Sequence, residues 1–237
     1  MLMQPPLALG QAVHEVIEGL SVLPVEERFT SSLLPKYEEA WKKVSGKKGG
    51  FADRATEEKF KARGKTMIER VMAHPGPLAS RAVKIRQDLP YFWLSEEDNI
   101  ILCGKIDWLE YVEDGDRVRI LDFKTGKYDE DPDSLQLPIY YLLAKNCQPR
   151  GIAGARYWYL DRDAEPVDVT LPEMEESKRR LGDIAKKIQL ARKLEHLVCT
   201  KKDGCSVCRP YESIIWGSTE FVGVGGYNQN IYILRAD

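Results

Sequence analysis

Two short stretches decide the fold: GKID at Gly104–Asp107 and LDFKTGK at Leu121–Lys127. Between them, Asp114-Gly115 separates two apolar runs, which is the sequence signal of a β-hairpin. We therefore expect paired antiparallel strands over Ile100–Val112 and Arg117–Thr125.

Side chains alternate across a strand, so Val118, Ile120, Asp122 and Lys124 should share one face. Asp107 follows the apolar run of the neighbouring strand. Two carboxylates and an ammonium can converge there, which suits a hard divalent cation with a lysine beside it for phosphate or water. A lone Asp-x-Lys pair also fits a surface salt bridge. Motifs elsewhere in the chain are needed to distinguish this alternative from a metal site.

Two further motifs lie in order along the chain. A helix predicted over residues 8–20 contains Gly10, His14 and Glu18 in the pattern GxxxHxxxE, and QLPIY follows at Gln136–Tyr140. Together the four motifs resemble the PD-(D/E)xK nuclease superfamily over roughly residues 8–210. The branch they resemble is that of the RecB/AddB-like exonucleases, which includes the CRISPR adaptation exonucleases.

The resemblance implies an α/β, restriction-endonuclease-like fold: a mixed central β-sheet flanked by helices, with a helical arm. We expect a single domain over 1–237, and its parts are a helical arm (21–80), a catalytic core sheet (82–160) and a C-terminal helix with a cysteine segment (173–210). Periodicity predicts helices over 55–72, 134–146 and 173–196. It predicts core strands over 82–94 and 154–160, and further strands over 167–171 and 231–234.

The resemblance also assigns roles to the site. Asp107, Asp122 and His14 would ligate Mg²⁺ or Mn²⁺, with the main-chain carbonyl of Phe123 as an extra ligand. Lys124 would orient or deprotonate the attacking water, or stabilise charge in the transition state. Without the resemblance, His14 fits an ordinary helix histidine, and Glu18 is expected in the second shell or at the surface.

Three more residues are expected to support this site. In the family, the residues matching Gln136 and Tyr140 face the active site and contact nucleic acid or orient the lysine. Tyr140 fits a plain core aromatic equally well. Lys127 is expected to touch backbone phosphates.

Cys199, Cys205 and Cys208 suggest a metal site, because Cys-x-x-Cys lies near a third cysteine. Many relatives hold an iron–sulfur cluster with one early and three late cysteines. Here no cysteine precedes His14, so the cluster would be incomplete, lost or replaced by Zn²⁺. The early helical segment of relatives is also missing, which suggests a truncated chain. Cys103 and Cys147 read as small buried hydrophobes.

Composition limits the partners. The 237 residues carry 35 basic and 37 acidic side chains and a formal charge of -2, so any DNA contact must come from local patches. The sequence has neither a transmembrane-length apolar run nor a basic signal region, which favours the cytoplasm.

The leading interpretation is a metal-dependent DNA exonuclease acting on ends or single strands, in repair, recombination or CRISPR spacer acquisition. It would work alone or with a helicase or CRISPR adaptation partner. Two alternatives stay open. One is a catalytically silent nucleic-acid-binding module. The other is a structural subunit of a helicase–nuclease complex, which exposed apolar residues around 91–93 would favour.

Overall fold

The computed structural model describes residues 1–199, 201, 204–225 and 228–235. The chain forms two compact units. The first unit comprises Met1–Ile17, Ser32–Glu69 and Leu197–Asp237, and the second comprises Glu18–Ser31 and Arg70–His196.

The second unit is built on a mixed four-stranded sheet. Its strands are β3 (Trp108–Val112), β4 (Arg117–Lys124), β5 (Gly151–Tyr159) and β6 (Val167–Val169), in the order β3-β4-β5-β6. The β3–β4 and β5–β6 pairs are antiparallel, whereas β4 and β5 are parallel. A parallel pair needs a crossover connection, and helix α4 (Gln136–Cys147) provides it.

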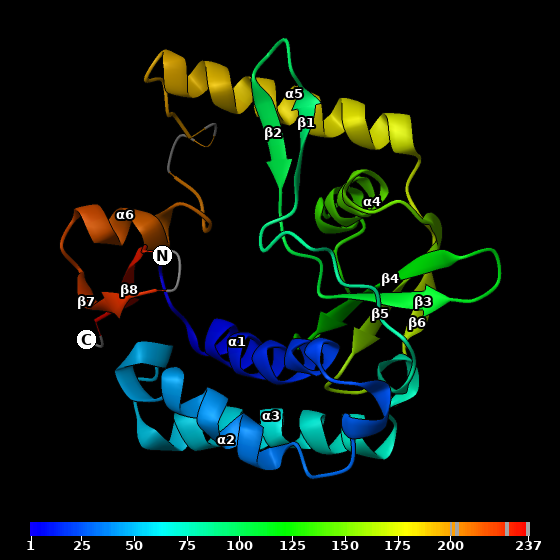
Figure 1. Ribbon diagram of the computed structural model, residues 1–237. Coiled ribbons are helices and arrows are strands. Elements are labelled where there is room, and N and C mark those ends of the chain that lie inside the picture. Colours follow the sequence, from blue (N-terminus) through cyan, green and yellow to red (C-terminus); the bar gives the residue numbers. More distant parts are fainter. Residues whose placement is uncertain (200, 202–203, 226–227, 236–237) are drawn as a thin grey trace. The chain divides into compact units, whose positions relative to one another are not determined.

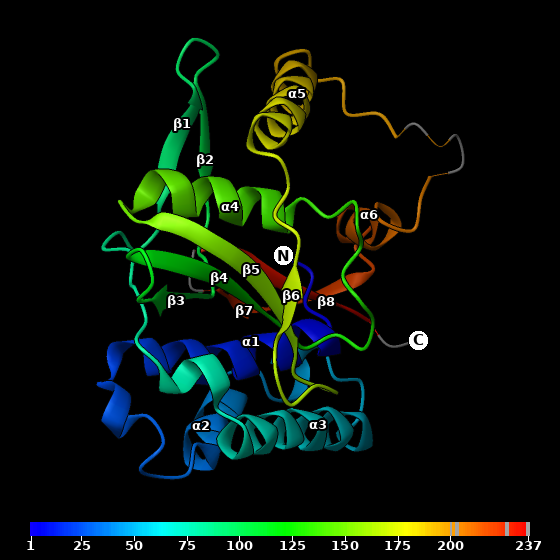
Figure 2. The same ribbon diagram turned by 90° about the vertical axis from the view of Figure 1, so that its right-hand side faces the viewer.

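Helix α4 covers one face of this sheet (Figure 2). Leu143 and Ala144 of the helix pack in one buried cluster with Val118, Ile120 and Ala155 of the sheet. The predicted alternation along β4 is therefore correct, because Val118 and Ile120 lie on the face that also carries Asp122 and Lys124. Helix α5 (Met174–Lys193) contacts α4 in turn. The predicted α/β class, a mixed sheet flanked by helices, is confirmed.

Two strand predictions are wrong in detail. Strand β1 (Tyr91–Ser95) pairs with β2 (Ile100–Cys103) in a separate two-stranded sheet, and of the predicted strand over 82–94 only Ala82 bridges to the core sheet. The chain leaves β2 at Gly104, which fits against α4 because a Cβ there would lie 3.0 Å from Leu143 Cδ1. The predicted strand over 100–112 is thus two strands, and Asp107 lies at the bend between them.

The first unit contains helix α1 (Pro5–Glu18), whose last residue belongs to the second unit, helix α2 (Leu34–Lys43) and the start of helix α3 (Arg54–Ala73). These helices lie side by side (Figure 1). The Tyr37 hydroxyl donates to the Lys61 carbonyl at 3.0 Å, and Trp41 Nε1 donates to Glu57 at 3.1 Å. Gly64 lets the helices approach closely, because a Cβ there would lie 2.2 Å from the Tyr37 oxygen.

The C-terminal part of the first unit forms helix α6 (Arg209–Ile215) and the hairpin of β7 (Thr219–Val224) and β8 (Asn230–Leu234). The strand predicted over 231–234 thus exists, and Met3 N donates to Tyr232 O at 2.8 Å beside it. Short 3₁₀ helices complete the chain (Gly19–Val22, Val25–Glu27, Gly46–Gly49 and Gly76–Ala79). No helix in the described residues combines the length and apolar character needed to cross a membrane.

Candidate active site

Asp122 and Lys124 lie at the carboxyl end of β4, in the centre of the four-stranded sheet. Asp122 is opposite Tyr157 of β5, and only 1% of its surface is exposed. Lys124 Nζ lies 5.0 Å from the centre of the Tyr157 ring. The sheet thus holds a carboxylate and an ammonium largely out of solvent, where charges interact more strongly than in water.

The bend before β3 brings Asp107 to the same place. Its Oδ2 accepts a hydrogen bond from the main-chain N–H of Phe123 at 3.0 Å, which ties the bend to β4. Its Oδ1 accepts one from the Tyr140 hydroxyl at 3.0 Å, which ties it to α4. Asp107 is therefore fixed from both the sheet and the helix.

Gln136 links these groups from the first turn of α4. Its Oε1 accepts from Lys124 Nζ at 2.6 Å, while its Nε2 donates to Tyr140 Oη at 3.2 Å and faces Asp122 Oδ1 at 3.4 Å. An ammonium has no acceptor, so this orientation of the amide follows from its partners. Gln136 and Tyr140 are four residues apart and lie on one helix face, as predicted.

Three oxygens surround Lys124 Nζ. Besides Gln136 Oε1, they are Asp122 Oδ2 at 2.9 Å and Glu130 Oε2 at 2.6 Å. An ammonium has three donors, so this set matches its capacity. Glu130 belongs to the loop 125–135 between β4 and α4, and no sequence motif pointed to it.

The charges shift one another. Burial and the neighbouring Asp107 raise the pKa of Asp122 to about 7, against the opposing effect of Lys124. Burial lowers the pKa of Lys124, but its two carboxylate neighbours outweigh burial and leave that pKa above its ordinary value. Burial raises the pKa of Glu130, but the Lys124 ammonium and the Ser134 hydroxyl leave it below its ordinary value.

The same residues fit a divalent cation. Asp122 Oδ2 is buried, and no described group gives it a hydrogen bond of acceptable geometry, although Lys124 Nζ is 2.9 Å away. The Lys124 ammonium therefore compensates this buried oxygen by charge alone, and the pKa of Asp122 stays raised because the carboxylate is buried and Asp107 lies beside it. Oxygen ligands from carboxylates are those that Mg²⁺ and Mn²⁺ prefer.

Glu18 joins the acidic cluster. One of its carboxylate oxygens lies within 4.8 Å of one from Asp107, and its Oε2 lies 2.6 Å from Lys105 Nζ. The sequence predicts Glu18 at the surface or in the second shell, behind the direct metal ligands. Its spacing four residues after His14 was the signal that could have placed it among the candidate ligands.

The other predicted site residues lie as follows. His14 is half-buried on α1 in the first unit, whereas the cluster belongs to the second, so its role as a ligand stays a prediction. The Phe123 side chain is buried beside Trp158, and the role of its carbonyl also stays a prediction. Lys127 is exposed in the loop after β4.

The late cysteines form a second cluster, in the first unit. The Sγ atoms of Cys199, Cys205 and Cys208 lie within 4.8 Å of one another. The main-chain N–H of Cys208 donates to Cys205 Sγ at 3.4 Å, and this contact lowers the pKa of Cys205. In the described part of the chain this cluster has three thiols, one fewer than a closed structural zinc site.

The reading of Cys103 and Cys147 as buried hydrophobes is wrong for Cys103, which is exposed at the end of β2. Cys147 is half-buried at the end of α4, and its thiol faces the Tyr91 carbonyl at 3.6 Å.

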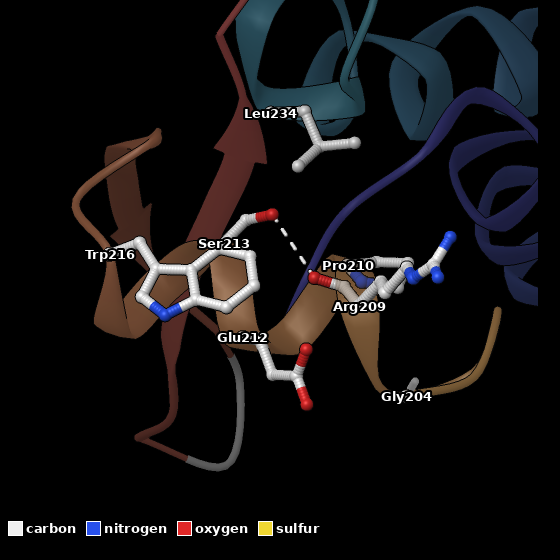
Figure 3. Close-up of a pocket in the computed structure, with 7 residues that line it drawn as sticks. All are labelled: Gly204, Arg209, Pro210, Glu212, Ser213, Trp216 and Leu234. Carbon is white, nitrogen blue, oxygen red and sulfur yellow. Dashed lines mark hydrogen bonds between the residues drawn. The ribbon is translucent and has the colours of Figure 1, made fainter. Parts of the chain in front are cut away.

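A pocket of about 570 Å³ lies between α6 and β8 in the first unit (Figure 3). The Trp216 ring and the side chain of Leu234 border it, and the Ser213 hydroxyl is turned back onto the Arg209 carbonyl at 3.1 Å. Its lining residues are Gly204, Arg209, Pro210, Glu212, Ser213, Trp216 and Leu234. The pocket contains none of Asp107, Asp122 and Lys124, which together form the carboxylate–lysine cluster.

Comparison with known proteins gives one match. Searches of curated proteins and of solved structures found no similar protein. A model of the PD-(D/E)XK nuclease superfamily matches residues 2–214, which include α1, the carboxylate–lysine cluster and α4. The chain belongs to the PD-(D/E)XK nuclease superfamily.

Proposed function

We propose that this protein is a divalent-metal-dependent deoxyribonuclease that hydrolyses phosphodiester bonds. The observation that carries the proposal is the convergence of Asp107, Asp122 and Lys124 at the carboxyl end of β4, where the Asp122 carboxylate is buried beside a second carboxylate and an ammonium. Membership of a nuclease superfamily supports it. Fold alone would not, because one fold serves many functions.

Asp107 and Asp122 would hold Mg²⁺ or Mn²⁺, which when bound polarises a phosphoryl oxygen and lowers the pKa of a bound water. Glu18 is added to this set because of its closeness to Asp107. His14 is one helical turn before Glu18 on α1, so helix geometry gives the two residues the same face. On this ground we keep His14 in the proposed ligand set, with the Phe123 carbonyl.

Lys124 would act as a cation. Its raised pKa and its three oxygen neighbours keep it protonated near neutral pH, which favours stabilisation of phosphate charge over removal of a proton from water. Tyr140 and Gln136 would hold Asp107 and Lys124 in position. Lys127, exposed in the adjoining loop, would contact a backbone phosphate.

The finer assignment is a RecB/AddB-like exonuclease that acts on DNA ends or single strands. It rests on the four sequence motifs and their order. Repair, recombination and CRISPR spacer acquisition are the pathways to which this branch leads, with a helicase or a CRISPR adaptation protein as the partner.

The experiment that tests the proposal compares four labelled DNAs: linear single-stranded, linear duplex, circular single-stranded and closed circular duplex. Each is incubated with the protein in Mn²⁺, Mg²⁺ or EDTA. A metal-dependent exonuclease degrades the linear DNAs, leaves the circular DNAs intact and has no activity in EDTA. Cleavage of the circles would replace the exonuclease assignment by an endonuclease, and no cleavage under any condition would refute the enzyme.

One observation favours a second function, docking of a partner protein. On one face of the β1–β2 hairpin, Tyr91, Trp93 and Ile101 are 50%, 44% and 46% exposed, and Trp93 lies opposite Ile101 in the register. Exposed aromatic side chains gathered on one face are typical of protein interfaces. If the protein were a structural subunit, the parent protein would show no metal-dependent cleavage. The Asp122→Asn variant would still bind DNA or the partner protein.

A further inference from the structure

We propose that Glu130 is a positioning residue that holds the Lys124 ammonium in place when a divalent cation engages Asp122. The proposal rests on the proposed nuclease function and adds a residue to it. Glu130 Oε2 lies 2.6 Å from Lys124 Nζ, which is closer than Asp122 Oδ2 at 2.9 Å. The two side chains are 22% and 12% exposed, so solvent screens this pair less than a surface salt bridge.

The loop that carries Glu130 is anchored on both sides. The main-chain N–H of Glu130 donates to the Tyr159 hydroxyl at 3.1 Å, at the end of β5. Asp129 forms an ion pair with Arg162, just after β5. Arg180 of α5 donates to the Asp133 carbonyl at 2.6 Å. These contacts fix the backbone before and after Glu130, so the carboxylate is presented to Lys124 by a tethered loop.

Glu130 would matter most when a divalent cation is bound at Asp122. A cation held by Asp122 would compete with Lys124 for the same carboxylate, because Oδ2 of Asp122 is the oxygen of that carboxylate paired with Nζ, at 2.9 Å. Without other anchors, a long lysine side chain would then be free to leave the site. Glu130 Oε2 and Gln136 Oε1 remain as two acceptors, each 2.6 Å from Nζ. The third Lys124 donor would then be available for a phosphate oxygen or water.

The first measurement uses the metal-free protein and does not depend on cleavage. In protein labelled with ¹⁵N-lysine, the exchange of the Lys124 ammonium protons with water is followed by NMR, and the signal is assigned by its loss in Lys124→Gln. Glu130→Gln should accelerate this exchange about tenfold or more, as expected for loss of a charge-assisted hydrogen bond. Asp133→Asn removes an exposed carboxylate from the same loop and should leave the exchange unchanged.

The second measurement is the kinetics of DNA cleavage in Mn²⁺. Glu130→Gln should lower kcat by about 10- to 100-fold with KM unchanged, because it disturbs a group that acts on the transition state. Glu130→Asp keeps the charge on a shorter side chain and should recover part of the lost kcat. Asp133→Asn should match the parent protein.

Unchanged proton exchange in Glu130→Gln would overturn the proposal, as would an unchanged kcat in that variant. A loss of kcat in Glu130→Gln that Glu130→Asp does not recover at all would also overturn it, since the charge would then be irrelevant. A parent protein without nuclease activity would refute the proposed function instead, and the proton-exchange result alone would then decide the role of Glu130.

Discussion

Asp122 combines burial, a like-charged neighbour and an oxygen, Oδ2, whose described partner is the Lys124 ammonium at 2.9 Å. Burial and the neighbouring Asp107 are unfavourable for an ionised carboxylate and outweigh the effect of Lys124, and such a balance is typical of a functional site. A divalent cation would offset the repulsion between Asp122 and Asp107 and would favour the ionised form of the buried carboxylate. We therefore expect the ionised Asp122 side chain to lower the stability of the metal-free protein, and we propose that the same side chain binds the cation.

The first prediction follows from the pKa of Asp122, which is about 7 in the folded protein and near 3.8 when unfolded. Between these values the folded state binds more protons, so this group makes the protein less stable as pH rises from 4 to 7. Asp122→Asn should raise the Tm of the metal-free protein at pH 8, by about 3 °C or more, and change it little at pH 5.

The check is a thermal unfolding series at both pH values, with Asp168→Asn as the control. Asp168 is an exposed carboxylate of the same sheet, paired with Arg156. Its substitution should not raise the Tm. A lower Tm for Asp122→Asn at pH 8 than for the parent would show that the buried charge is well compensated without metal.

The second prediction concerns Lys124. Lys124→Ala should reduce DNA cleavage by about 100-fold or more while the Kd for DNA changes only a few-fold, because the ammonium acts mainly on the transition state. Cleavage rates and fluorescence anisotropy measure the two quantities. Lys145→Ala, which removes an exposed lysine of α4, is the matched control. Full activity of Lys124→Ala would remove this residue from the mechanism.

At the scale of elements, α4 covers the core sheet and also supplies the polar contacts that orient the site. Its apolar residues pack on β4 and β5, while Gln136 and Tyr140 reach Lys124 and Asp107. The helical spacing of four residues makes both contacts possible from one face. Helix α4 therefore couples the packing of the core to the geometry of the carboxylates.

The third prediction tests that coupling. Tyr140→Phe removes the hydroxyl that donates to Asp107 and accepts from Gln136, and it leaves the apolar ring in the core. We expect activity in limiting Mn²⁺ to fall about 10-fold, in line with other groups that orient metal ligands. Tyr141→Phe makes the same chemical change one residue later and should have little effect. Equal activities of the two variants would show that Tyr140 serves only the core.

The fourth prediction concerns the cysteine segment. Three thiols within 4.8 Å of one another should retain zinc or iron in protein purified without oxygen. Plasma mass spectrometry should find the metal in the parent and in Cys103→Ser, whose cysteine lies on β2, and lose it in Cys205→Ser. Parent protein free of both metals would remove the cluster from the account.

Sequence periodicity predicted the helices and strands better than it predicted where one strand ends and the next begins. Strand β4 and helix α4 carry clear periods of two and of about four residues, so their faces and their polar residues could be assigned in advance. The break at Gly104 could not, because it depends on the fit of the chain against Leu143, a contact between distant residues. That break places Asp107 at a bend.

Glu130 escaped prediction for a related reason. It lies in the loop 125–135, which has no periodicity, and its position is set by Tyr159, Arg162 and Arg180. Glu18 carried a weak signal through its helical spacing from His14. Residues in regular elements were thus accessible from the sequence, whereas residues held by long-range tethers were not.

At the scale of the whole molecule, the chain is nearly neutral, with a formal charge of -2. Affinity for DNA would then come from local positive groups and from the metal site. This balance distinguishes the proposed enzyme from proteins that coat DNA by net positive charge. At the proposed metal site, the bound cation would contribute both to DNA affinity and to cleavage.

The most direct test is therefore the Mn²⁺-dependent cleavage of end-labelled linear DNA by three proteins purified in parallel: the parent, Asp122→Asn and Asp168→Asn. The account predicts degradation by the parent and by Asp168→Asn, none in EDTA, and a loss of at least about 100-fold in Asp122→Asn. Equal cleavage by Asp122→Asn and the parent would contradict it, because the buried carboxylate would then have no part in the reaction.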